Sequence, residues 1–322
     1  YTDIDKPSDY FNTKLYTGTG SELAITGVGF QPDWVWLKKR NAEYTHFLYD
    51  SVRGATKSIR SGETNAETTV SESLKSFDSN GFTLGTSGDA NGSGGTYVGW
   101  NWKKTATAGF DIVAYTGTGS SNAVSHSLSA TPNMMIIKNR DDSDSWYVWH
   151  QGLGAVATNY IVLDTTGAAS SVDNGIIALS SSNFTVNTRG DVNENNMKYI
   201  AYCFAEKKGY SKFGSYTGNG NADGTFVYTG FKPAFVMVKR TDSAQSWYML
   251  DNKRNTFNPV DKYLLANTSA AEDTFIIPDF LSNGFKLRGT GSGSNASGGS
   301  FIYMAFAKNP FVTSTGVPAT AR

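Results

Sequence analysis

Residues that could carry catalysis are few in this sequence, and they do not recur together. His46, His126 and His150 lie at unrelated points of the chain, and His126 is not followed by the Gly-x-Ser-x-Gly turn that exposes a nucleophilic serine. No His-Glu-x-x-His, Cys-x-x-Cys or phosphate-binding loop is present. We interpret Glu63 and Glu67 as solvated, because no similar pair stands elsewhere to act as the carboxylates of a glycosidase. The sequence therefore predicts a protein that is not an enzyme and has no cofactor.

One segment resembles the start of a calcium-binding loop. Asp191-Val-Asn-Glu-Asn195 offers oxygen atoms at alternate positions, but Asn196 stands where such a loop needs glycine and Tyr202 where it needs glutamate. We predict no metal at this loop, and a lectin-type calcium site built from several loops stays open. Cys203, the single cysteine, is expected to be a small packed residue without a disulfide.

Two acid–base pairs recur with the same spacing. Asp50 and Arg53 return as Asp251 and Arg254, whereas the intervening part of the chain has His150 in place of the acid. These pairs are candidate ligand-binding residues, and the alternative is a turn held by a local ion pair, which we favour. Basic residues that end a nearby apolar run are expected to be solvated charges at a strand edge; they include Lys38, Lys138 and Lys239.

Aromatic side chains are the other candidates for ligand contact, because tryptophan and tyrosine rings stack on sugar rings. Aromatic residues make up 13% of the chain. Most tryptophans align with Phe, Met or Ile elsewhere in the chain, which is typical of a core. The candidate ligand contacts are Tyr44, Tyr147 and Trp149.

The elements that position these residues form a threefold repeat. Tyr16-Thr-Gly-Thr-Gly returns as Tyr115-Thr-Gly-Thr-Gly and as Tyr216-Thr-Gly-Asn-Gly, at intervals of about 100 residues. Aromatic and β-branched runs separated by Gly, Asn and Ser clusters predict strands and turns throughout. We therefore predict an all-β protein of three tandem antiparallel β-sandwich repeats. The expected boundaries are an N-terminal arm (1–15), three repeats (16–106, 107–208 and 209–310) and a C-terminal tail (311–322).

A proline-led strand in each repeat is apolar on both faces. Trp34 and Trp36 share one face in the first repeat, and the opposite face is apolar too. A strand with two apolar faces needs a second cover besides its own sandwich, either a loop, a neighbouring domain or a second chain. The candidate subunit contacts are Val35, Leu37, Met135, Ile137, Val236 and Val238. In the closing strand, we expect Val98, Trp100 and Trp102 to face the core of the sandwich.

Glycine-rich loops occur at the same place in each repeat, at 85–95, 187–196 and 289–299. We expect all three to emerge at one end of their sandwich, where binding loops usually lie. Formal net charge is zero, with 28 basic and 28 acidic side chains, which disfavours nucleic acid as a partner. No apolar run is long enough to insert in a membrane.

The sequence resembles repeat-built, tail-fibre-like proteins of marine and cyanobacterial bacteriophages. The resemblance covers nearly the whole chain and is strongest in the first repeat. It rests on these segments: Lys6-Pro-Ser-Asp-Tyr-Phe-Asn-Thr-Lys-Leu-Tyr-Thr-Gly-Thr-Gly, Gly29-Phe-Gln-Pro-Asp-Trp-Val-Trp-Leu-Lys, Asp50-Ser-Val-Arg-Gly-Ala-Thr-Lys, Ser76-Phe-Asp-Ser-Asn-Gly-Phe-Thr-Leu-Gly and Gly316-Val-Pro-Ala-Thr-Ala-Arg. It implies a virion structural or adhesion role and a concanavalin-like or jelly-roll sandwich, and it supplies no catalytic residue.

The resulting expectation is a virion protein of the tail-fibre or spike type that folds in the host cytoplasm and contacts host surface polysaccharide. Its expected partners are further copies of the same chain, with a homotrimer favoured, and other virion proteins. The alternatives are a collar, decoration or scaffold protein without a ligand, and a polysaccharide-binding module or depolymerase.

Overall fold

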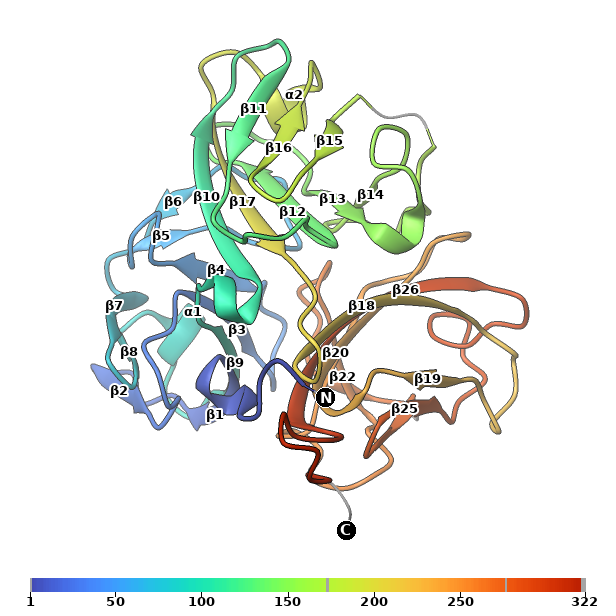
Figure 1. Cartoon of the computed structure of the whole chain (residues 1–322). Helices are drawn as coiled ribbons and strands as arrows, with labels where there is room; N and C mark the ends of the chain where they lie inside the picture. The colour runs from blue at the N-terminus through green and yellow to red at the C-terminus, as the bar shows by residue number, and fades with distance from the viewer. Residues whose placement is uncertain (1, 172–173, 276, 320–322) are drawn as a thin grey trace.

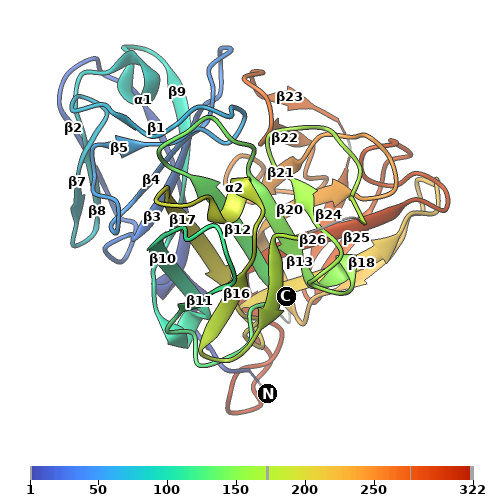
Figure 2. The ribbon, with the colours of Figure 1, turned by 90° about the horizontal axis from the view of Figure 1, so that it is seen from above.

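The computed structural model describes residues 2–171, 174–275 and 277–319. It is all-β: several antiparallel sheets, none of them closed, are arranged as three lobes around a common centre (Figure 1). Seen from above, the blue, green and orange lobes follow the order of the chain around that centre (Figure 2). The described helices are single turns: η1 (Pro7–Asp9), α1 (Gly88–Asn91), η2 (Ala106–Ala108), η3 (Gln151–Leu153) and α2 (Gly190–Asn193).

Lobe 1 contains a larger sheet and a smaller one. The larger sheet has the order β1-β9-β3-β4, formed by β1 (Phe11–Thr17), β9 (Thr96–Trp102), β3 (Trp34–Lys39) and β4 (Phe47–Asp50). The smaller has the order β2-β8-β7, formed by β2 (Leu23–Thr26), β8 (Gly81–Leu84) and β7 (Leu74–Asp78). A two-stranded ribbon, β5 (Lys57–Ser58) and β6 (Thr68–Thr69), lies beside them. Strand β1 begins inside the segment expected to be an N-terminal arm.

Lobe 2 repeats this plan with the same strand order. Its larger sheet is formed by β10 (Phe110–Thr116), β17 (Lys198–Phe204), β12 (Met134–Asn139), β13 (Tyr147–His150) and β14 (Ile161–Val162). Its smaller sheet is formed by β11 (Asn122–Ser125), β16 (Asn183–Val186) and β15 (Ile176–Leu179).

Lobe 3 follows the same order again. Its larger sheet is formed by β18 (Ser211–Thr217), β26 (Ser300–Pro310), β20 (Phe231–Arg240), β21 (Tyr248–Asp251), β22 (Lys262–Leu265) and β23 (Asp273–Thr274). Its smaller sheet is formed by β19 (Phe226–Tyr228), β25 (Gly284–Leu287) and β24 (Pro278–Leu281).

The recurring Tyr-Thr-Gly-x-Gly motif closes each lobe by clamping its glycine-rich loop. In lobe 1 the hydroxyl of Tyr16 donates to the carbonyl of Ala90 (2.8 Å), and its ring stacks on Tyr97. The buried amide of Asn91 bonds the backbone of both loops. A Cβ at Gly18 would lie 2.3 Å from the Gly92 carbonyl oxygen, so only glycine fits there. Asn193 and Asn295 hold the other two loops in the same way.

The two faces of the proline-led strands enter two different cores. Val35 and Leu37 pack between the two sheets of lobe 1, together with Phe82 of the smaller sheet. Trp34 and Trp36 point the other way, into a central cluster that contains side chains from all three lobes. The neighbouring lobe of the same chain is therefore the second cover of each strand.

The closing strands place their larger side chains in the central cluster, not in the sandwich core that the sequence indicated. Trp100, Tyr202 and Met304 occupy equivalent positions there. The ring of Trp34 stacks on Tyr202 at 4.5 Å between centroids, and Trp102 contacts Phe306 at 5.7 Å. The opposite face is packed closely on both sides: a Cβ at Gly99 would lie 3.0 Å from Leu37 of the same sheet and 3.5 Å from the Phe82 ring of the smaller sheet. The three lobes therefore share one core and are not independent domains in series.

Candidate functional site

The recurring pair of Asp50 and Arg53 lies between lobes 1 and 2, a contact called junction 1–2 below. Both side chains are fully buried and form an ion pair, and the Arg53 guanidinium also donates to the Leu48 carbonyl (2.9 Å). The hydroxyl of Tyr202, from lobe 2, donates to Asp50 Oδ2 at 2.8 Å. The local ion pair holds the turn that follows β4, as in the favoured interpretation, and it is buried between two lobes, so it is not an open ligand site.

Glu67 extends this network to the rim of junction 1–2. Its carboxylate accepts from Arg53 of its own lobe (3.3 Å) and from Arg140 of lobe 2 (2.9 and 3.0 Å). Its backbone N–H also donates to the Arg140 carbonyl. The expectation that Glu67 is solvated was wrong, because the side chain bridges two guanidinium groups.

Junction 3–1, between lobes 3 and 1, repeats the arrangement. Asp251 and Arg254 form a fully buried ion pair, and the indole N–H of Trp100 in lobe 1 donates to Asp251 Oδ2 at 3.1 Å. Glu272 takes the place of Glu67 and accepts from Arg254 (3.3 Å) and from Arg40 of lobe 1 (2.7 Å). The two glutamates share a short Ala-Glu-x-Thr segment, at 66–69 and 271–274, and this is the sequence signal that could have revealed the match.

Junction 2–3 lacks every one of these charges. His150, Leu153, Ala169, Thr241 and Met304 stand at the equivalents of Asp50, Arg53, Glu67, Arg140 and Tyr202. His150 Nε2 lies 3.0 Å from the Tyr303 carbonyl of lobe 3, and Nδ1 accepts from the Gly152 N–H at 3.0 Å. Burial lowers the pKa of His150 to about 4, so the imidazole is neutral and donates from Nε2.

The lysines expected at an exposed strand edge are buried. Lys38, Lys138 and Lys239 are at most 1% exposed. Each ammonium group donates to loop carbonyls, and two of them reach the preceding lobe in the ring: Lys38 bonds Ser269 (3.2 Å) and Lys239 bonds Thr166 (3.0 Å). Burial lowers the pKa of each of these three lysines to about 8. Lys38 and Lys239 thus help to close junctions, and Lys138 holds a loop of its own lobe through the carbonyls of Asn139 and Asp142.

The aromatic ligand candidates divide into buried and exposed positions. Tyr147 is fully buried and Trp149 is 6% exposed; both belong to the core of lobe 2. Tyr44 is exposed, with the Lys39 ammonium 4.4 Å from its ring centroid. Of the three, Tyr44 alone can meet a ligand in this structure.

The candidate subunit contacts are also internal. They lie in the cores between the two sheets of each lobe, and none is more than 1% exposed. These residues are Val35, Leu37, Met135, Ile137, Val236 and Val238. Contact with another chain would need other side chains.

Exposed aromatic side chains gather on lobe 3. Of six exposed aromatics among the described residues, one is Tyr44 and the others are Phe226, Tyr228, Phe257, Phe275 and Phe311. Phe226 and Tyr228 lie on the outer face of β19. The equivalent positions carry Ala24 and Thr26 in lobe 1, and Ala123 and Ser125 in lobe 2. Aligning the repeats for positions that are large in one copy and small in the others would have revealed these two aromatics.

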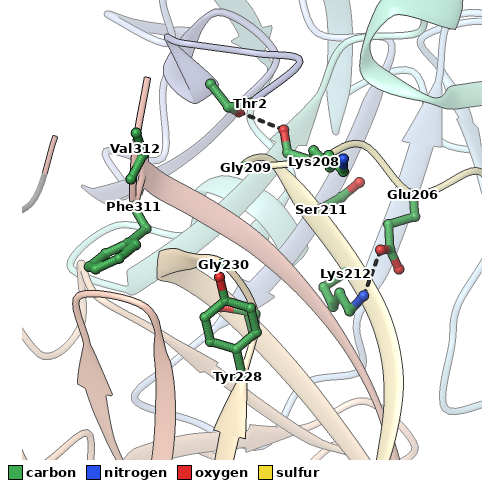
Figure 3. Close-up of a pocket in the computed structure, with 11 residues that line it drawn as sticks. Thr2, Glu206, Lys208, Gly209, Ser211, Lys212, Tyr228, Gly230, Phe311 and Val312 are labelled. Atoms are coloured by element: carbon green, nitrogen blue, oxygen red, sulfur yellow. Dashed lines mark hydrogen bonds and ion pairs between the residues drawn. The ribbon is translucent and has the colours of Figure 1, made fainter. Parts of the chain in front are cut away.

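A pocket of about 340 Å³ opens beside these aromatics, and it is called the terminal pocket here. Tyr228 of β19 and Phe311 of the C-terminal tail line it together with Thr2, Ser211 and the ion pair of Lys212 and Glu206 (2.7 Å). Figure 3 shows Phe311 on one side of the pocket and Glu206 on the other, with the Tyr228 ring between them. The hydroxyl of Thr2 donates to the Lys208 carbonyl at 2.6 Å, which ties the N-terminal segment to the rim.

The described residues offer little for metal or redox chemistry. Within them, no group of three or more His, Cys, Asp or Glu side chains is placed to hold a metal ion. Asp191, considered for calcium, pairs with Arg189 (2.7 Å), and Asn193 is buried. Burial raises the pKa of the Cys203 thiol well above its usual value, so the thiol stays protonated. None of the described helices is long and apolar enough to cross a membrane.

A family model described as a domain of unknown function, DUF7483, matches residues 6–310. The chain belongs to this family. The match runs through all three lobes as a single unit, in keeping with their shared core. No curated protein matches the sequence.

Proposed function

We propose that this DUF7483 protein is a non-catalytic bacteriophage virion protein of the tail-fibre or spike type, and that lobe 3 contacts glycans of the host surface. The observation that carries the proposal is the collection of exposed aromatic rings on lobe 3, two of which, Phe226 and Tyr228, stand at positions that are small in the sister lobes. Exposed apolar side chains that lie together mark contact surfaces, and Tyr228 and Phe311 line one pocket.

The terminal pocket has the composition of a saccharide site. Tyr228 is 59% exposed and offers a ring face for stacking. The hydroxyls of Thr2 and Ser211 and the charged groups of Lys212 and Glu206 surround it. Sugar hydroxyls can exchange hydrogen bonds with these groups, and the lysine suits an acidic sugar.

A non-catalytic role is favoured by where the titratable groups lie. The two recurring acid–base pairs, His46 and His150 serve contacts between lobes and are buried away from any substrate. We further propose that each lobe is a β-sandwich of the concanavalin-like or jelly-roll class. The shared core would make the three lobes a stiff module for a virion surface.

Binding to purified host surface polysaccharide tests the adhesion proposal. Deleting the glycine-rich loops would unfold the lobes, because each loop is clamped by a buried asparagine. We therefore choose Tyr228→Ala and Phe311→Ala, with Phe257→Ala as a control at an 84% exposed ring outside the terminal pocket. Loss of binding in the first two variants with retention in the control supports the proposal.

The contrary outcomes identify the alternatives. A blank glycan array, with binding to other virion proteins, would point to a collar, decoration or scaffold protein. Release of reducing ends from the polysaccharide would point to a depolymerase. Assembly as a homotrimer belongs to the proposal through the fibre resemblance, and light scattering at several protein concentrations tests it separately.

A further inference from the structure

A second pocket on lobe 3 shares no residue with the terminal pocket. Its volume is about 270 Å³. Tyr248, Tyr263 and Phe275 give it aromatic walls, Asp273 lies on its rim, and the loop 291–294 closes one side. It is called the tyrosine pocket below.

In lobe 2, the protein's own side chains fill the place that corresponds to the tyrosine pocket of lobe 3. Tyr147 and Tyr160 stand at the positions of Tyr248 and Tyr263, and their rings stack at 5.4 Å between centroids. The guanidinium of Arg189 covers the face of Tyr160 at 3.8 Å from the ring centroid. Asp191 holds that guanidinium: Arg189 Nε donates to both oxygens of its carboxylate, at 2.7 and 2.8 Å. A guanidinium stacked on tyrosine and paired with a carboxylate is therefore a stable arrangement at this position of the fold.

Lobe 3 has lost both charged members of this arrangement. Counting back from the buried asparagine of each loop, Gly291 replaces Arg189 and Gly293 replaces Asp191. The pocket exists because neither glycine has a side chain: a Cβ at Gly293 would lie 2.4 Å from the Tyr248 ring. The tyrosine walls remain, and no residue of loop 291–294 supplies a cation.

Lobe 3 has also gained a carboxylate at the rim. Asp273 faces Tyr263 across the β22–β23 ladder, at the position of Ser170 in lobe 2. The Tyr263 hydroxyl donates to Asp273 Oδ2 at 3.1 Å, and the residue is exposed. Arg240 is a basic group that reaches the same loop, through the Ser292 carbonyl, but it is paired with Asp242 at 2.8 Å. Within the described residues no cation forms an ion pair with Asp273.

We infer that the tyrosine pocket binds a guanidinium group, that of an arginine side chain on a partner, stacked on Tyr263 and paired with Asp273. The partner arginine takes the place that Arg189 fills within lobe 2. Gly291 brings no side chain of its own into that place, where the exposed Phe275 ring lies alongside, 2.8 Å from where a Cβ of residue 291 would stand. The carboxylate comes from β23 instead of from the glycine-rich loop. This inference is independent of the proposed glycan contact, which uses other residues.

The test is a titration of the intact protein with N-acetyl-arginine methylamide, followed by NMR line shifts of the tyrosine ring protons. The matched neutral ligand is N-acetyl-citrulline methylamide, which has the same shape without the charge. We expect saturable binding of the arginine ligand. Asp273→Asn, a change at an exposed side chain, should weaken it about three- to tenfold.

Gly291→Arg supplies the guanidinium from within the chain and should abolish binding of the free ligand. Ser87→Arg is its control: it changes the equivalent loop position of lobe 1, where Ser58 replaces the tyrosine, and binding in lobe 3 should persist. Equal binding of the citrulline ligand, unchanged affinity in Asp273→Asn, or no saturation would overturn the inference. So would preferential binding of neutral sugars at the same tyrosine protons, and that result would leave the terminal-pocket proposal untouched.

Discussion

The hydroxyl of Tyr202 in lobe 2 donates to the buried carboxylate of Asp50 in lobe 1, 152 residues away in the sequence. The same carboxylate pairs with Arg53 and accepts from two backbone N–H groups at the start of the turn. One aspartate thus ends a strand, orders a turn and fixes the neighbouring lobe. The cost of burying its charge is offset by this full set of donors.

Tyr202→Phe should destabilise the protein by about 1–3 kcal/mol, because Asp50 loses a donor that water cannot replace in the interior. Chemical denaturation measures the change. Tyr210→Phe is the matched control: its hydroxyl is equally buried, and it has no hydrogen-bond partner among the described residues. We expect that control to be neutral or slightly stabilising, and equal losses in both variants would show that the bond to Asp50 contributes nothing.

Arg254→Leu should be more damaging than the double change that also replaces its partner. The single variant leaves the Asp251 charge buried without its cation, which costs about 3–5 kcal/mol in comparable cases. Asp251→His with Arg254→Leu copies the His150 and Leu153 pair of junction 2–3, so it should recover part of that loss. Urea titrations, which measure the free energy of unfolding, show which of the two variants is the more stable. A double variant less stable than the single one would contradict it.

Acid should weaken the contacts between lobes through the buried histidines. Burial lowers the pKa of His150 to about 4 and that of His46 well below 6.5. As the pH falls, the unfolded chain therefore takes up protons on these histidines before the folded chain does. The free energy of unfolding that the neutral histidines contribute is complete above about pH 6.5. It is lost as the pH falls toward 4, and the loss is roughly 3 kcal/mol for His150. His150→Gln keeps an amide donor for the Tyr303 carbonyl without a titrating group. Its stability should fall less steeply over that interval, and an identical slope would contradict the assignment.

The buried lysines should also make stability rise with pH, here in alkali. Burial lowers the pKa of Lys239 to about 8, whereas an exposed lysine titrates near 10.4. Between these values the unfolded chain holds more protons, so the contribution of Lys239 to stability rises with pH. Lys239→Met should flatten the rise measured by thermal unfolding from pH 8 to 10. Stability that is flat for the parent protein over this interval would contradict the prediction.

The strands and their turns follow from the sequence because alternation, glycine positions and the threefold repeat all report local geometry. Alternation cannot tell which of two apolar faces meets another lobe, since Val35 and Trp34 are equally apolar. The sequence alone therefore does not show that Trp34 faces the central cluster whereas Val35 faces the core between the two sheets of lobe 1. Which face of the strand meets another lobe depends on how the three lobes pack together.

The burial of charged side chains was the property that the sequence predicted least well. Glu67 and Lys38 resemble ordinary solvated charges in sequence, and their burial depends on partners more than 70 residues away. Asp50 and Arg53 were visible as a recurring pair, but the third partner, Tyr202, lies in another lobe, at a position that holds Trp100 and Met304 in the sister lobes. The exposed rings of β19 were detectable, since the repeats themselves provide the comparison.

Covalent linkage gives the central cluster a property that three separate subunits could not have. Closure of the ring is unimolecular, with an effective concentration set by the short connections between lobes, so dilution does not open it. A trimer of identical chains must also use one interface three times. A single chain is free of that constraint, and its junction 2–3 has lost the buried ion pairs that the other two junctions keep. The chain thus fixes which lobe neighbours which, and lobe 3 can specialise without altering its sisters.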